Sequence, residues 1–270
     1  MAPVILYDLP SKGRCACWSL NPWKTRMALN YKNIQYETQW LEYPDVAPTL
    51  RAAGLAPNEG GPEVTAYTIP TVKFPDGTYV MESFKIAQEI EKRYSSAPPL
   101  RLDHPVVAQI IAVIPTIQKP LSAVLIPRVP RVLLNDKSVP YFQETRKVRF
   151  GMSLDEYEKE KGGDAAWVAA KQPIENLAAL LRQTKTADGP YFLGSEGEQP
   201  LQPLWTLCLV HLASRIADWG TVSYADFIVA SLLHFVKLLG PELYDRFVTH
   251  DKAFDDLYQA CAKWLERDDH

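Results

Sequence analysis

Two short stretches of the sequence carry residue types that could bind a small peptide. The first is Thr68-Ile69-Pro70, in which a proline precedes an expected strand over residues 71–74. A peptide bond before proline adopts the cis form at a cost of only about 0.5–1 kcal/mol. A cis Ile69–Pro70 bond would turn the backbone sharply and leave the N–H and C=O of Ile69 exposed at the end of the sheet. These are the groups with which an extended peptide ligand pairs.

The second stretch is Glu82-Ser83, at the start of an expected helix over residues 83–94. The unpaired N–H groups and the positive dipole end of a helix favour a carboxylate. The Ser83 hydroxyl adds a donor, and Glu82 can accept from an ammonium group. A ligand with a peptide backbone, a carboxylate and an amine suits these groups, and a γ-glutamyl tripeptide meets that description. The alternative is a simple helix start with a solvated Glu82, and Thr68 is a weaker candidate for ligand contact.

The elements that position these stretches alternate between strand and helix patterns. Strands are expected at residues 4–9, at 34–43 and at 79–81, the last after a turn at Pro75–Gly77. Helices are expected from Pro22, which suits a helix start, and over residues 44–54. The order β-α-β-α-β-β-α predicts one mixed sheet with helices on both faces.

Helical patterns take over after a proline-containing linker at residues 95–100. Five prolines between residues 115 and 140 predict short or bent helices there. Ser153 with Glu156, and Ser223 with Asp226, have the spacing of capped helix starts. We therefore expect one domain over residues 1–96 and a mainly helical domain over residues 104–270.

Bulk composition excludes several classes of protein. The chain has 270 residues, is 47% hydrophobic and 23% charged, and carries a net charge of −3. This balance gives no electrostatic reason to bind nucleic acid or an anionic membrane. No stretch approaches membrane-spanning length and the start lacks a secretory signal, so a cytoplasmic protein is expected. The four cysteines and five histidines lack metal-ligand spacing, and no metal is expected.

The motifs together resemble the glutathione-binding subdomain of glutathione transferases. The shared features are Ile-Pro before a strand, Glu-Ser after a hairpin, and a helix beginning Ser-x-x-Ile. The resemblance covers most of the chain and implies a thioredoxin-like N-terminal domain followed by an all-helical domain that forms an apolar electrophile pocket. The stretches "DLPSK", "WSLNPWKTRMALNYKNIQYETQWLEYPD" and "YFQETRKVRFGMSLDE" are similar to the fungal FuA class, which is related to bacterial lignin β-etherases. The resemblance also implies glutathione as substrate or cofactor and a homodimer.

The same resemblance implies a group that activates the glutathione sulfur. Similar classes use the serine of Ser-x-x-x-Trp-(Lys/Arg)-Thr, which here is Ser19, and Asn21 is a second possible donor. A hydroxyl donor at a helix N-terminus favours a thiolate by stabilising its charge. This chain departs from the class at Leu20, where a proline is usual. Two alternatives stay open: Ser19 is only a helix cap, or Cys17 has a lowered pKa and forms a mixed disulfide with glutathione.

The expected function is conjugation of glutathione to an apolar electrophile, or cleavage of an ether bond in one, through a thiolate stabilised by Ser19. The alternatives are a glutathione-dependent cis–trans isomerase acting on a conjugated double bond in a fungal secondary metabolite, and a non-catalytic binder of glutathione or hydrophobic ligands. Residues 195–222 do not fit the resemblance, because the family has a short loop there. We interpret them as either a genuine insert or a retained intron translated in frame.

Overall fold

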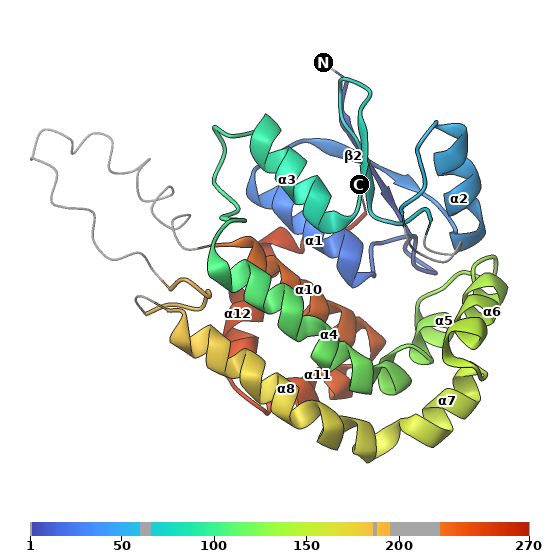
Figure 1. Cartoon of the computed structure of the whole chain (residues 1–270), viewed down its shortest axis with the longest axis vertical. Helices are drawn as coiled ribbons and strands as arrows, with labels where there is room; N and C mark the ends of the chain where they lie inside the picture. The colour runs from blue at the N-terminus through green and yellow to red at the C-terminus, as the bar shows by residue number, and fades with distance from the viewer. Residues whose placement is uncertain (1, 60–65, 186–187, 195–221, 270) are drawn as a thin grey trace, which may run out of the picture.

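The protein consists of a small sheet unit followed by a larger helical unit (Figure 1). The computed structural model describes residues 2–59, 66–185, 188–194 and 222–269. The sheet unit contains β1 (Val4–Asp8), α1 (Leu20–Tyr31), β2 (Tyr36–Trp40), α2 (Tyr43–Ala52), β3 (Thr71–Lys73), β4 (Tyr79–Met81) and α3 (Ser83–Arg93). The helical unit contains α4 (Pro105–Leu125), α5 (Arg128–Val132), α6 (Val139–Phe150), α7 (Leu154–Lys161), α8 (Gly163–Gln183), α10 (Tyr224–Leu239), α11 (Pro241–Val248), α12 (Ala253–Cys261) and the 3-10 turn η3 (Ala262–Trp264). This order confirms the predicted fold class.

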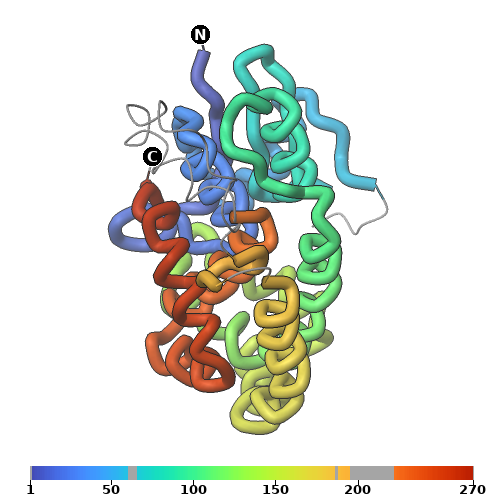
Figure 2. Tube along the Cα trace, turned by 90° about the vertical axis from the view of Figure 1, so that its left-hand side faces the viewer, coloured from blue at the N-terminus to red at the C-terminus, as the bar shows by residue number. Residues whose placement is uncertain are grey.

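The sheet has four strands in the order β2-β1-β3-β4. β1 runs parallel to β2 and antiparallel to β3, and β3 pairs with β4 as a hairpin. Leu6 in the middle of β1 lies opposite Val72 of β3, and both side chains are fully buried. In β2, Tyr36 is buried while Glu37 and Gln39 are exposed, as the predicted alternation requires. Figure 2 shows this unit stacked on the helical unit.

Helix α1 begins at Leu20 rather than at Pro22, so the predicted start was two residues late. Ser19 is its N-cap residue, and Pro22 lies inside the first turn. Proline is tolerated there because the first N–H groups of a helix have no partner within it. With α1 starting at Leu20, Asn21 lies in its first turn and Lys24 begins its second.

Helix α4 corrects the expectation that prolines would keep helices short after residue 115. It runs for 21 residues through Pro115 and Pro120. Each proline leaves the carbonyl four residues earlier without a helical donor, and these carbonyls belong to Ile111 and Thr116. Both residues are solvent-exposed, so water can donate a hydrogen bond to each of these carbonyls. The prediction holds for the five-residue α5.

The expectation that no segment reaches membrane-spanning length is also wrong by length, because α4 is long and apolar enough to cross a membrane. Its buried side, which includes Ile110, Ile114 and Ile117, packs against α8 and α10. These are the contacts of a core helix of a globular unit.

Two predicted capping boxes are present. At α7, Ser153 and Glu156 cap each other's backbone N–H groups. At α10 the Ser223–Asp226 pair is fully buried, and Asp226 accepts from the Ser223 N–H at 2.7 Å and from the Phe192 N–H at 2.8 Å. The second bond ties the chain before residue 195 to the start of α10. The sequence from 195 to 221, which includes almost all of the unusual segment, lies outside the described residues.

Candidate functional site

A cavity of about 410 Å³ lies between the sheet unit and the helical unit. One side comes from α1, the segment before β3, and the start of α3; the other comes from α4 and α10. The lining residues are Asn21, Lys24, Thr68, Ile69, Pro70, Glu82, Ser83, Phe84, Ile111, Ile114, Pro115, Gln118, Tyr224 and Ile228. Six of the predicted binding residues are thus brought together: Asn21, Thr68, Ile69, Pro70, Glu82 and Ser83.

The Ile69–Pro70 peptide bond is cis, as the sequence predicts. β3 starts at Thr71, one residue after the proline. Among the hydrogen bonds of the described residues, none involves the main-chain N–H or C=O of Ile69. Both groups are therefore available to an extended ligand at the end of the sheet.

Glu82 has an unusual backbone conformation at the entrance of α3. Its φ is +73°, in the region that non-glycine residues adopt at a cost of about 1–3 kcal/mol. Its carboxylate oxygen Oε1 accepts from the Thr68 hydroxyl at 2.6 Å and from the Asn58 amide at 3.2 Å. These two bonds orient an exposed carboxylate beside the cavity. Thr68 therefore acts on Glu82 as well as lining the cavity.

Lys24 is a site residue that the sequence interpretation missed. It is half-buried, lines the cavity, and its Nζ donates to the Asn21 side-chain oxygen at 2.9 Å. Burial lowers the pKa of Lys24 to about 8, against the opposing effect of Glu82. Within the described part of the chain, no carboxylate lies within ion-pair distance of Lys24. The signal in the sequence is the basic position of the Ser-x-x-x-Trp-(Lys/Arg)-Thr motif, which Lys24 occupies.

The opposite wall of the cavity is largely apolar. Ile111, Ile114 and Pro115 come from α4, and Ile228 comes from α10. Gln118 adds one amide to this wall. One side of the cavity thus carries groups suited to a charged peptide, and the other side is a surface suited to an apolar ligand.

Ser19 does not line this cavity, although Asn21 on the same helical turn does. Ser19 is partly exposed at the N-terminus of α1, and its hydroxyl makes no capping hydrogen bond. The Ser19 side chain therefore does not cap α1. Its main-chain oxygen accepts from the Trp23 N–H at 3.1 Å.

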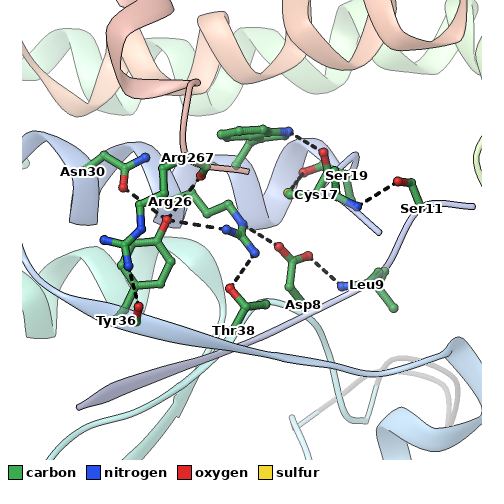
Figure 3. Close-up of polar contacts among 12 residues, drawn as sticks. Asp8, Leu9, Ser11, Cys17, Ser19, Arg26, Asn30, Tyr36, Thr38 and Arg267 are labelled. Atoms are coloured by element: carbon green, nitrogen blue, oxygen red, sulfur yellow. Dashed lines mark hydrogen bonds and ion pairs between the residues drawn. The ribbon is translucent and has the colours of Figure 1, made fainter. Parts of the chain in front are cut away.

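Cys17 lies just before Ser19 (Figure 3) and is buried, with 3% of its surface exposed. Burial, reinforced by the Asp8 carboxylate, raises the pKa of the Cys17 thiol well above its ordinary value. A reactive cysteine needs a lowered pKa and access to its partner. This argues against the alternative in which Cys17 has a lowered pKa and forms a mixed disulfide, because burial outweighs the dipole of α1.

A buried ion pair holds the loop between β1 and α1. Asp8 at the end of β1 accepts from Arg26 Nε at 2.7 Å, and both side chains are fully buried (Figure 3). Arg26 also donates to the Thr38 hydroxyl at 2.8 Å. The pair therefore links β1, β2 and α1 behind the loop that carries Cys17 and Ser19.

The C-terminal segment supports the same loop. The Cys17 N–H donates to the Asp268 carbonyl at 2.8 Å. Arg267 donates to the Tyr36 carbonyl of β2 at 2.6 Å, and its guanidinium lies 4.1 Å from the Tyr36 ring centroid. Residues near the end of the chain thus complete the sheet unit.

The protein combines a thioredoxin-like sheet unit with a helical unit, and a cavity between them presents groups suited to a small peptide. This combination is typical of glutathione-dependent proteins. Family models bear this out: one described as the N-terminal domain of glutathione S-transferase matches residues 18–93, and one described as its C-terminal domain matches residues 109–264. The chain belongs to the glutathione S-transferase family.

Several of the individual proteins that the chain resembles come from fungi. The chain is 28% identical to the glutathione S-transferase-like protein ustS of Aspergillus flavus, over 98% of this chain and 92% of that protein. Glutathione transferase GSTFuA3 of Phanerochaete chrysosporium superposes with a TM-score of 0.78 at 25% identity, covering 98% of each chain. The glutathione S-transferase CsGST63524 of Ceriporiopsis subvermispora, solved in complex with glutathione, has a TM-score of 0.78 at 27% identity, covering 97% of this chain and 98% of its own.

Proposed function

We propose that this protein is a glutathione transferase that joins glutathione to an apolar electrophile or uses it to cleave an ether bond in one. The observation that carries the proposal is the cavity, in which peptide-binding groups of the sheet unit face an apolar wall from α4 and α10. Family membership supports it, as does the similar Ceriporiopsis subvermispora enzyme that was crystallised with glutathione.

The proposed ligand pose follows from charge and from free backbone groups. The γ-glutamyl ammonium binds the Glu82 carboxylate, which Thr68 and Asn58 already orient. The α-carboxylate of the same residue binds at the N-terminus of α3, beside the Ser83 hydroxyl. The cysteinyl unit pairs with the main chain of Ile69. Lys24 supplies positive charge for a ligand that is a net anion.

In this proposal Ser19 and the N-terminus of α1 stabilise the glutathione thiolate. A free thiol has a pKa of about 8.5, so few molecules are ionised at neutral pH. Each unit by which the site lowers that pKa corresponds to about 1.4 kcal/mol of preference for the thiolate. The Ser19 hydroxyl accepts and donates nothing among the described residues, so it is free to donate to sulfur. Asn21 is the second possible donor.

The thiolate then attacks an electrophilic carbon held against the apolar wall. The sulfur electron pair forms the new C–S bond, and in an ether substrate the C–O bond breaks, its electrons leaving with the oxygen. The leaving oxygen takes a proton from solvent. The apolar wall from Ile111, Ile114 and Ile228 excludes water from the attacking sulfur.

The test is to incubate the protein with glutathione and a panel of aryl ether, epoxide and conjugated enone electrophiles, and to follow both compounds by mass spectrometry. Formation of a glutathione adduct or a cleaved ether supports the proposal. An isomerised product with an unchanged glutathione concentration would support the isomerase instead. Glutathione binding by calorimetry with no turnover on any electrophile would support a binder.

A further inference from the structure

Tyr224 lies where the helical unit meets the glutathione-type groups of the sheet unit. It is the first residue of α10, directly after the Ser223 cap, and its N–H donates to the Leu100 carbonyl at 2.8 Å. Its ring packs against Phe84 of α3, with ring centroids 5.9 Å apart. Both residues line the cavity. The backbone of Tyr224 is thus fixed, and its side chain borders the ligand space.

The hydroxyl of Tyr224 is buried without a partner. The residue is 1% exposed, and its Oη makes no hydrogen bond of ordinary geometry with a described residue, although the Ser83 side chain lies close to it. Most buried polar side-chain atoms have a partner, and an unsatisfied one costs about 1–3 kcal/mol. Phenylalanine would fill the same volume without that cost. The hydroxyl therefore suits a partner that comes from the cavity.

The surroundings of the hydroxyl select the kind of partner. Burial raises the pKa of Tyr224 far above its ordinary value, and the hydrogen-bonding influence of the nearby Ser83 hydroxyl offsets this only in part, so the phenol stays protonated and can donate. Ser83 is the first residue of α3, where further N–H donors are unpaired. Three kinds of donor thus meet at this corner: the phenol, the serine hydroxyl and the helix N–H groups. Converging donors at a positive dipole end bind a carboxylate.

We propose that Tyr224 is a specificity-determining residue that donates a hydrogen bond to the α-carboxylate of a γ-glutamyl ligand held at the N-terminus of α3. This inference rests on the proposed function, since it assumes that a γ-glutamyl tripeptide occupies the cavity. It adds a residue from the helical unit to a subsite otherwise built from the sheet unit. Recognition of the carboxylate then depends on both units being correctly packed.

The proposal is tested by calorimetry on the full-length protein and its Tyr224→Phe variant with two ligands. One is S-methylglutathione, whose blocked sulfur excludes turnover. The other is the same molecule with a 4-aminobutanoyl group in place of the γ-glutamyl group, which lacks only the α-carboxylate. Tyr224→Phe weakens S-methylglutathione binding about tenfold, which corresponds to about 1.4 kcal/mol, and leaves the affinity for the carboxylate-free ligand unchanged.

A matched control is Tyr157→Phe. The Tyr157 hydroxyl forms a hydrogen bond of 2.7 Å with the Ser122 hydroxyl, and neither residue lines the cavity. Tyr157→Phe leaves both affinities unchanged. Without ligand, Tyr224→Phe melts at the same temperature as the unchanged protein or higher, because the hydroxyl it removes has no partner. A marked loss of stability would overturn the inference by revealing a protein partner.

Two binding results overturn the inference and separate it from the proposed function. If the unchanged protein binds S-methylglutathione and Tyr224→Phe binds it equally well, the inference fails and the proposed function stands. The inference also fails if the variant weakens both ligands by the same factor, since the carboxylate is then not the partner. If the unchanged protein binds neither ligand, the proposed function fails with it.

Discussion

Lys24 should make ligand affinity depend on pH in a way that no other described residue of the cavity reproduces. Its ammonium group is half-buried beside Asn21, and burial lowers its pKa to about 8. The group is therefore mostly charged at pH 7 and mostly neutral at pH 9. An anionic ligand that needs the charged form should bind less tightly as pH rises through 8.

The size of the effect follows from the titration. If only charged Lys24 contributes to binding, affinity scales with the charged fraction, which falls from about 0.9 at pH 7 to about 0.09 at pH 9 for a pKa of about 8. The contribution of Lys24 should therefore weaken about tenfold over these two pH units. An unperturbed lysine, with a pKa near 10.4, would change affinity by only a few per cent over the same range.

The assay is calorimetric binding of S-methylglutathione between pH 6.5 and 9, with Lys24→Met and Lys24→Arg as variants. Dividing each affinity by that of Lys24→Met at the same pH cancels the titration of the ligand's own amine. After the same division, the affinity of Lys24→Arg should be equal at pH 9 and pH 7, because arginine stays charged.

Either of two results would refute this reasoning. One is a ratio of unchanged protein to Lys24→Met that stays constant from pH 6.5 to 9. The other is a ratio of Lys24→Arg to Lys24→Met that falls with pH as the ratio for the unchanged protein does. Both would place the ligand's negative charge away from Lys24.

Other residues give independent predictions. Ser19→Ala should raise the thiol pKa of bound glutathione by about one unit or more, measured by thiolate absorbance, while Cys17→Ala leaves it unchanged; equal spectra for Ser19→Ala and the unchanged protein would contradict the assignment. Asp8→Ala should lower the free energy of unfolding by about 3–5 kcal/mol in urea titrations, because it leaves a buried guanidinium unpaired, whereas Asp45→Ala, which breaks an exposed pair, should cost less than about 1 kcal/mol. Asp226→Asn should destabilise the fold by about 2–4 kcal/mol near pH 4, because an asparagine cannot accept from every buried donor that the Asp226 carboxyl group serves. Burial raises the pKa of Asp226 to about 6, so its contribution to stability is greatest below pH 4 and is lost as pH rises through 6; a difference between Asp226→Asn and the unchanged protein that does not vary from pH 4 to 7 would contradict this.

The sheet unit was predictable from sequence because its signals are local. Local sequence predicts the conformation of each of its parts. These are Pro70 before β3, the turn at Pro75–Gly77 and the short apolar strands. The residues at the ends of these elements meet because the sheet order brings them together. The sequence therefore predicts that Ile69, Glu82 and Ser83 share one site, and all three line the cavity.

Other features depend on distant parts of the chain and could not be predicted from local pattern. Helix α4 tolerates Pro115 and Pro120 because one side of it faces solvent, which is a property of its packing. The lowered pKa of Lys24 and the raised pKa of Cys17 both come from burial by residues remote in sequence. Tyr224 follows a capping serine, and nothing in its sequence position indicates that its hydroxyl borders the cavity.

The order in which the chain is synthesised sets a limit on when the site can form. The loop carrying Cys17 is synthesised long before α4 to α12, yet the carbonyl that accepts from the Cys17 N–H belongs to Asp268. The Tyr36 carbonyl of β2 likewise accepts a hydrogen bond from Arg267, which is synthesised much later. Nascent chains halted after α3 would hold the strands but present this loop without its support, so glutathione capture should begin only after Arg267 and Asp268 have been synthesised.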